Sequence, residues 1–154
     1  MKFYYKDTNN NLRVIDDKLE HLLPKGCVKI TDEEVDAIRN PPLEQLKEIK
    51  KNVIRNSFNI DSINDVIVDG VSYHGGMDSA MKLEAAQRFA ELAGSPTVVF
   101  YDITNKKNVL KIDVAKHIVL TIVDDFQVKL SKKQAAMIKI DSAKTEAALN
   151  KISY

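Results

Sequence analysis

A chain of 154 residues that is 44% hydrophobic and 29% charged can bury a globular core, and aliphatic side chains must supply most of it because Trp is absent. The net charge of +1 gives no sign of a polyanionic partner, and the basic residues 105–154 contain neither Arg nor a basic run with interleaved aromatics, so no nucleic-acid site is expected. One cysteine, Cys27, excludes an intrachain disulfide, and no window approaches the ~18–20 apolar residues of a membrane helix.

Residues 1–40 predict a small N-terminal β/α module. Residues 3–5, 12–15 and 27–30 favour short strands, with turns rich in Asn and Asp or in Pro and Gly between them. Thr31 followed by Glu34 is a capping box, which predicts a helix that ends before Pro41-Pro42, because the residue before proline avoids the helical region.

Residues 41–59 predict a connecting helix that starts at Leu43 and reaches about residue 56. Its apolar side chains fall on one face, and lysine and arginine cover the others. The pattern indicates a helix docked on a core by one face, with a partner-binding helix as the alternative. The residues of this candidate interaction surface are Leu43, Leu46, Ile49 and Val53.

Residues 60–154 predict an α+β domain that begins with a hairpin and a helix. Asp69-Gly70 between two strand-prone triplets suits a type I′ turn, whose two central residues need positive φ. Gly75-Gly76 then breaks the strand, and Asp78 is expected to cap a helix over residues 79–93. The face expected to point inward on this helix consists of Met81, Ala85, Phe89 and Leu92.

A second hairpin is expected over residues 97–112, followed by a long helix that Asp113 caps and that ends near residue 140. The first half, which contains HIVLTIV, is apolar nearly all round and is expected to be buried. The far half has a narrower apolar line and is expected to project, so Leu130 and Met137 join the candidate interaction surface. The predicted architecture is therefore a small antiparallel sheet built from two hairpins, with a covering helix and a long C-terminal helix.

His74-Gly75-Gly76 resembles the segment whose amides form the oxyanion hole of some esterases. That chemistry also needs an activated nucleophile, and no Gly-x-Ser-x-Gly occurs. Ser79 lies at a helix start, and nothing in the sequence links it to His21 or His117 as a base. No catalytic residue is assigned, and a small hydrolase is kept only as a distant alternative.

Cofactor and metal chemistry have equally little support in the sequence. Gly75-Gly76 before a helix could receive a phosphate, but the loop has no Walker lysine. The pairs His74 with Asp78 and Asp113 with His117 offer two ligands each, where a metal site needs three or four. The sequence therefore predicts no cofactor and no metal, and Cys27 is interpreted as an inert strand thiol.

The stretch VDGVSYHGGMDSA, residues 68–80, resembles a domain of unknown function at the C-terminal end of bacteriophage tail-fibre and tail-fibre-assembly proteins. Members have a hydrophobic strand, Asp-Gly, a short strand, an alanine-rich helix, a hairpin rich in Thr and Val, and a long helix. The likeness covers about residues 60–154. Tyr4-Tyr5, residues 24–30 and the Thr31 capping box are more loosely similar to the start of tail-fibre assembly proteins.

The resemblance implies a phage protein that is not an enzyme and that acts by protein–protein contact. It would be a tail-fibre assembly chaperone or a small fibre-associated component, located in the virion tail or in the host cytoplasm during assembly. Its partner would be a tail-fibre or other tail protein, and self-association is left open. The alternative is a fibre module that recognises host-surface glycan, although Tyr4, Tyr5, Tyr73 and Tyr101 offer little aromatic platform.

Overall fold

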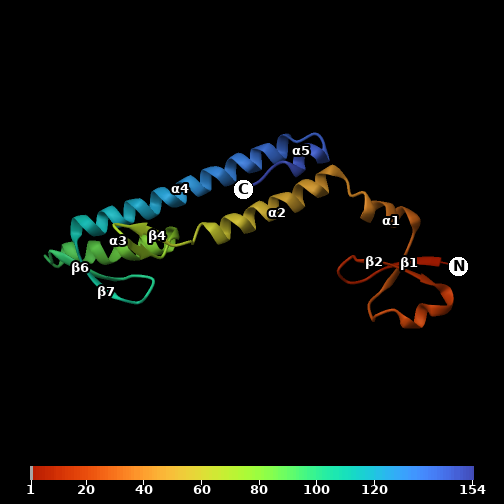
Figure 1. Cartoon of the computed structure of the whole chain (residues 1–154), viewed down its shortest axis with the longest axis horizontal. Helices are drawn as coiled ribbons and strands as arrows, with labels where there is room; N and C mark the ends of the chain where they lie inside the picture. Colours follow the sequence, from red (N-terminus) through yellow and green to blue (C-terminus); the bar gives the residue numbers. More distant parts are fainter. Residues whose placement is uncertain (1) are drawn as a thin grey trace. The chain divides into compact units, whose positions relative to one another are not determined.

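The computed structural model describes residues 2–154, which divide into two compact units, one ending at Glu48 and one comprising Ile49–Tyr154. The elements labelled in Figure 1 confirm the predicted α+β class. The first unit holds β1 (Lys2–Lys6), β2 (Leu12–Asp16), the 3-10 helix η1 (Asp17–Leu22), β3 (Val28–Ile30) and α1 (Asp32–Arg39). The boundary between the units falls within α2 (Leu43–Asp61). The second unit continues with β4 (Val66–Val68), β5 (Val71–Tyr73), α3 (Gly76–Leu92), β6 (Thr97–Tyr101), β7 (Lys107–Lys111), α4 (Ile112–Ser142) and α5 (Glu146–Asn150).

The first unit is a three-stranded antiparallel sheet in the order β2-β1-β3, followed by α1. The capping box forms as predicted: Thr31 Oγ1 accepts from the Glu34 amide at 3.2 Å, and the Glu34 carboxylate accepts from the Thr31 amide at 3.0 Å. Tyr5 and Val35 are buried in this unit. The predicted division into residues 1–40, 41–59 and 60–154 stays a prediction.

In the second unit both predicted hairpins form, and each makes its own two-stranded antiparallel sheet. The first turn has the predicted geometry, with φ of 51° at Asp69 and 78° at Gly70. One backbone hydrogen bond, from the Ile103 amide to the Ser72 carbonyl at 3.2 Å, connects the two hairpins. The inner side chains of both hairpins are buried against α3 and α4.

The main core lies between the two hairpins, α3 and the first half of α4. Its buried hydrophobic members are Val66, Val68, Tyr73, Ala80, Leu83, Val98, Leu110, Ala115, Ile118 and Ile122. The predicted burial of HIVLTIV on all sides is wrong, because Leu120 is 62% exposed while Ile118 and Ile122 are buried. The first half of α4 therefore has one buried face.

Two predicted helix caps are absent. The cap position of α3 is Gly75, three residues before Asp78, and Asp78 pairs with Lys82 at 2.6 Å instead. The helix can begin early because the backbone at Gly75 packs against the Asn64 carbonyl, where a Cβ would lie 2.0 Å from that oxygen. Likewise α4 is capped by Lys111 without a side-chain hydrogen bond, and Asp113 lies in the first turn, where an acidic group favours the helix dipole.

The inward face predicted for α3 is the outward face in the structure. Met81, Phe89 and Leu92 are 61%, 72% and 84% exposed. The buried face consists mainly of small residues together with Leu83 and Gln87, and α3 packs against α4 through it. Alanine on the contact face lets two helix backbones approach closely, so the bulky side chains are left on the other side.

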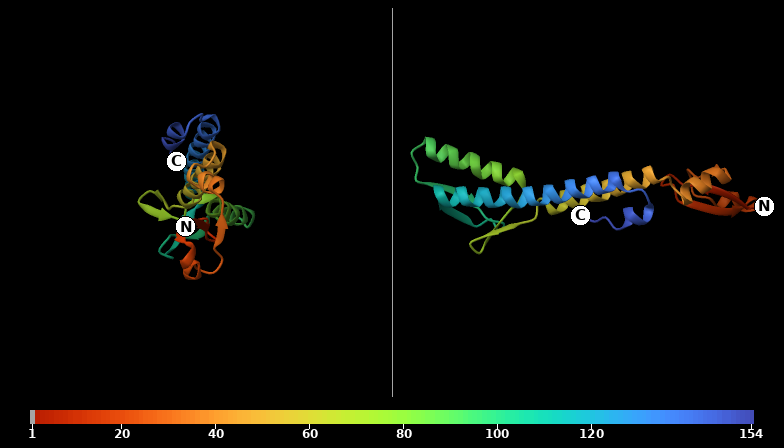
Figure 2. Two further views of the ribbon diagram at one scale, coloured as in Figure 1. Left: turned by 90° about the vertical axis from the view of Figure 1, so that its right-hand side faces the viewer. Right: turned by 90° about the horizontal axis from the view of Figure 1, so that it is seen from above.

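The second half of α4 packs beside residues 49–61 of α2, and Figures 1 and 2 show the two lying alongside each other. Ile54 and Phe58 of α2 are buried, and the Phe58 and Phe126 rings meet edge to face with centroids 5.6 Å apart. The lysines of α2 were expected to lie off the packed face, yet Lys51 bonds Asp141 of α4 at 2.8 Å.

The C-terminal segment completes this second core. Thr145 caps α5 as predicted, and Leu149 and Ile152 are buried. The Tyr154 hydroxyl donates to Asp61 of α2 at 2.9 Å, and burial together with this bond raises the pKa of Tyr154 to about 12. The far half of α4 is thus covered on two sides, by α2 and by the C-terminal residues. The prediction that this half projects from the domain is wrong for those sides.

Candidate functional site

The His74-Gly75-Gly76 loop is a backbone junction whose histidine lies on the surface. His74 Nδ1 is 3.3 Å from the Asp65 carboxylate, and both side chains are well exposed. Within residues 2–154 the structure records no hydrogen bond between Ser79 and a histidine. Both glycines contact the backbone of residues 62–64, which explains their presence without a ligand.

The most heavily hydrogen-bonded carboxylate of the second unit is Asp102, in the turn between β6 and β7. Its Oδ1 accepts from the Thr104 hydroxyl at 2.6 Å and from the Lys106 amide at 3.0 Å, and its Oδ2 accepts from the Asn108 amide at 3.3 Å. The Thr104 hydrogen bond is the largest cause that lowers the pKa of Asp102, to about 2. Thr104 and Lys106 belong to the turn and Asn108 to the start of β7, so Asp102 holds the hairpin loop in place.

Metal-ligating side chains do not gather in the described part of the chain. No group of three or more His, Cys, Asp or Glu residues is placed to hold an ion within residues 2–154. In particular, Asp78 is paired with Lys82, and His74 faces Asp65. Over the same residues, none of the helices combines the length and the apolar character needed to cross a membrane.

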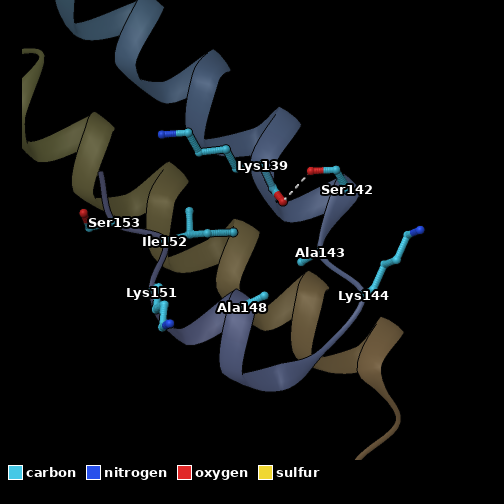
Figure 3. Close-up of a pocket in the computed structure, with 8 residues that line it drawn as sticks. All are labelled: Lys139, Ser142, Ala143, Lys144, Ala148, Lys151, Ile152 and Ser153. Atoms are coloured by element: carbon cyan, nitrogen blue, oxygen red, sulfur yellow. Dashed lines mark hydrogen bonds between the residues drawn. The ribbon is translucent and has the colours of Figure 1, made fainter.

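A pocket of about 420 Å³ lies where the end of α4 turns into α5 (Figure 3). Its lining residues are Lys139, Ser142, Ala143, Lys144, Ala148, Lys151, Ile152 and Ser153. Figure 3 shows the three lysine side chains pointing in different directions rather than toward one another, and the Ser142 hydroxyl donates to the Lys139 carbonyl at 3.0 Å. Ligand sites have converging polar groups, so we assign no ligand to this pocket.

The outer face of α3 exposes three large apolar side chains, Met81, Phe89 and Leu92. We call it the α3 surface and define it as Met81, Ala85, Phe89 and Leu92, which recur at intervals of four, four and three residues. This spacing places all four on one side of a helix, opposite the buried Leu83. Large apolar side chains exposed together make this face a candidate protein-binding surface.

Two shallow pockets lie along α3, so the surface of this region is not flat. One, of about 320 Å³, is lined by Ala85, Arg88, Phe89 and Leu92. The other, of about 420 Å³, lies between α3 and α4, and its residues are Glu84, Gln87, Lys116, Val119 and Leu120. Apolar side chains of a partner helix or strand could enter both, since such pockets receive the anchors of protein interfaces.

Charged side chains border the α3 surface. Lys116 of α4 bonds Glu91 of α3 at 2.9 Å. This hydrogen bond lowers the pKa of Glu91 and raises the pKa of Lys116. Arg88 lies beside Phe89 and Leu92 in the first pocket. An apolar centre with a charged rim is the usual composition of a protein interface.

Of the six interaction residues predicted from the sequence, two lie in the first unit and four in the second, and the surface that they were expected to form stays a prediction. Ile49 and Val53 of α2 are about half exposed, at 52% and 51%. Leu43, Leu46, Leu130 and Met137 are only partly exposed. The α3 surface was missed, and the signal that identifies it is the run of alanines on the opposite side of the helix, at Ala80, Ala86 and Ala90.

Comparison of the sequence with models of protein families, and of the chain with curated proteins and with solved structures, finds no match.

Proposed function

We propose that this chain is a bacteriophage tail protein that acts by binding another protein, as a tail-fibre assembly chaperone or a small fibre-associated component. The phage context comes from the resemblance of residues 60–154 to the tail-fibre-associated domain. The observation that carries the binding function is the α3 surface, where Phe89 and Leu92 are 72% and 84% exposed. The partner is a tail-fibre or other tail protein, met in the host cytoplasm during assembly or retained in the virion tail.

The large exposed side chains of the α3 surface can contribute a substantial part of a binding free energy. Burying a large apolar side chain completely contributes about 1.5–3 kcal/mol, so Phe89 and Leu92 together would supply roughly 2–5 kcal/mol from their exposed fractions. That amount corresponds to about a 30- to 5,000-fold change in affinity. These two residues are therefore the expected anchors, and the flexible Met81 adapts to the shape of the partner.

Co-expression with a tail-fibre protein of the same phage tests the proposal. The wild-type chain should keep the fibre protein soluble and should co-purify with it. The double variant Phe89→Ser/Leu92→Ser should lose co-purification while keeping its melting temperature, because both side chains are exposed. Ile138→Ser, which changes a 69% exposed residue of α4, is the matched control and should behave as wild type. Equal recovery of the fibre protein with all three chains would rule out the α3 surface as its binding site.

A further inference from the structure

The β6–β7 hairpin, labelled in Figure 1, has one face in the core and the other in solvent. Val98 and Leu110 belong to the core and are 5% and 9% exposed. Side chains alternate along a strand, so their neighbours lie on the opposite face. On that face Val99, Tyr101 and Val109 are 43%, 53% and 62% exposed, and Val99 lies directly across from Val109. The hairpin therefore presents to solvent an apolar strip that the core does not use.

Two lysines of β7 border this strip. Lys107 and Lys111 lie two residues before and two residues after Val109, so they share its face, and both are exposed. Among residues 2–154 the structure records no ion pair for either ammonium group, whereas Lys116 of α4 bonds Glu91 at 2.9 Å. We call this side of the hairpin the β6–β7 outer face, which consists of Val99, Tyr101, Lys107, Val109 and Lys111.

The backbone of β7 is also open on one side. In the part of the chain that the structure describes, β6 is the only strand paired with β7. The Asp102 amide donates to the Lys106 carbonyl at 3.1 Å and closes the hairpin with a hydrogen-bonded pair. Bonded and non-bonded pairs alternate from there, so the backbone N–H and C=O groups of Lys107, Val109 and Lys111 point away from β6. The same three residues thus have exposed side chains and outward backbone groups.

These features favour an extended acidic segment as the occupant of this edge. A strand added beside β7 would bond the outward backbone groups and place one side chain across from each of the three residues. An apolar side chain suits Val109, and carboxylates suit Lys107 and Lys111, because opposite charges directly across a ladder attract. The matching segment has two acidic residues that flank an apolar residue, with one further residue on each side of it.

Other occupants satisfy these features less well. Pairing of β7 with β7 of a second copy, centred on Val109, places lysine beside lysine in either strand direction, and lysine on an edge strand opposes such pairing. A nucleic acid offers phosphates to the lysines but no strand for the open backbone edge. Charge complementarity and backbone geometry together therefore favour a protein segment.

We propose that β7 binds an extended acidic segment of a partner protein, which adds to the hairpin as a third strand. Backbone hydrogen bonds supply the affinity, and the two lysines with Val109 fix the register of the added strand. The edge is only three residues long and its charges are exposed, so an isolated peptide binds weakly and less well as salt increases. This site is separate from the α3 surface and does not depend on the phage role proposed above.

NMR titration of the isotopically labelled full chain with the peptide Thr-Glu-Thr-Val-Thr-Glu-Thr tests the proposal. The amide signals of Lys107, Val109 and Lys111 should move, and their hydrogen exchange should slow, because these N–H groups face the open edge. Phe89→Ser/Leu92→Ser should bind the peptide normally, which separates this site from fibre binding. Signals that stay unmoved overturn the proposal. Signals that move with chain concentration before peptide is added also overturn it, since a second copy would then occupy the edge.

Charge reversal tests the register. Lys107→Glu/Lys111→Glu should weaken binding of the acidic peptide about tenfold at low salt and should bind Thr-Lys-Thr-Val-Thr-Lys-Thr instead. Lys132→Glu/Lys139→Glu changes two exposed lysines of α4 and is the matched control, because it has the same net charge and should bind the acidic peptide as wild type does. Equal weakening in the two double variants, or the same signal changes with a mixed-sequence DNA duplex, would mean that net charge alone attracts the probe and would overturn the proposal.

Discussion

The loop at His74-Gly75-Gly76 and the outer face of α3, which begins at that loop, differ in how much the fold constrains them. Gly75 has no room for a side chain, because a Cβ would lie 2.0 Å from the Asn64 carbonyl oxygen. The side chains of Phe89 and Leu92 are largely exposed to solvent, so the packing of the fold constrains them little. The loop has an unusual sequence motif, but its glycines serve the packing of the backbone. The α3 surface has no recognisable motif, yet its exposed apolar side chains suit it to binding. Substitutions should therefore affect stability at the loop and binding at the helix.

The largest effect on stability is expected from Gly75→Ala. The new methyl group would meet backbone, which cannot rotate away, so the free energy of unfolding should fall by about 3 kcal/mol or more. Gly94→Ala is the matched control: nothing lies within 4 Å there, but φ is +68°, so only the cost of a left-handed backbone, about 1–2 kcal/mol, is expected. Urea denaturation of the two variants would distinguish them, and equal losses would contradict the close packing at Gly75.

Gly70→Val should have a smaller effect, of roughly 1–3 kcal/mol, because the site has space but φ is +78°. A β-branched residue is poorly tolerated in the left-handed region, and the type I′ turn between β4 and β5 needs that conformation. Thermal unfolding checks this directly. An unchanged melting temperature would show that the hairpin does not depend on positive φ at this glycine.

Acid should weaken the loop held by Asp102. Its pKa is lowered from 3.8 to about 2 in the folded chain, so the folded state favours the charged carboxylate. The contribution is complete above pH 4 and is lost as the pH falls through 2, where the folded state also takes up the proton. The unfolding free energy of wild type should therefore drop more between pH 4 and 2 than that of Asp102→Asn. Parallel pH profiles for the two chains would show that this carboxylate does not contribute.

The smallest effect is expected from His74→Ala. The contact between His74 and Asp65 is exposed and 3.3 Å long, and such surface pairs contribute about 0–1 kcal/mol. Stability and partner binding should both stay close to wild type, as measured by thermal unfolding and by co-purification. A large loss of stability or of partner binding would mean that the loop has a function of its own. The loop and the α3 surface would then no longer differ in role.

Local sequence signals predicted most of the elements of the fold. The Thr31 capping box, the Asp69-Gly70 turn and the Thr145 cap are short-range patterns with one favoured geometry, and all three occur. The two failed caps, Asp78 and Asp113, show the limit of this reasoning. At α3 the helix starts where the chain packs against residues 62–64, and that contact is not visible in a local pattern.

Burial was harder to predict, because α2 and α3 each have two apolar faces. Periodicity identifies an apolar face but does not say which of two faces meets the core. On α3 the face rich in alanine packs against α4, because small side chains let the two helices approach closely. On α2 the buried Phe58 lies beyond the predicted end of the helix, so the covered face was not recognised. The surfaces that now support the functional proposals are the ones that the core did not use.

Calorimetric titration of the purified fibre protein with purified variants of this chain is the most direct test of the binding role of the α3 surface. Leu92→Ser should weaken the affinity by roughly tenfold or more, because an 84% exposed anchor is lost from the interface, and the heat-capacity change on binding should become less negative. Ile138→Ser should leave both quantities unchanged. Equal affinities for wild type, Leu92→Ser and Ile138→Ser would contradict the account.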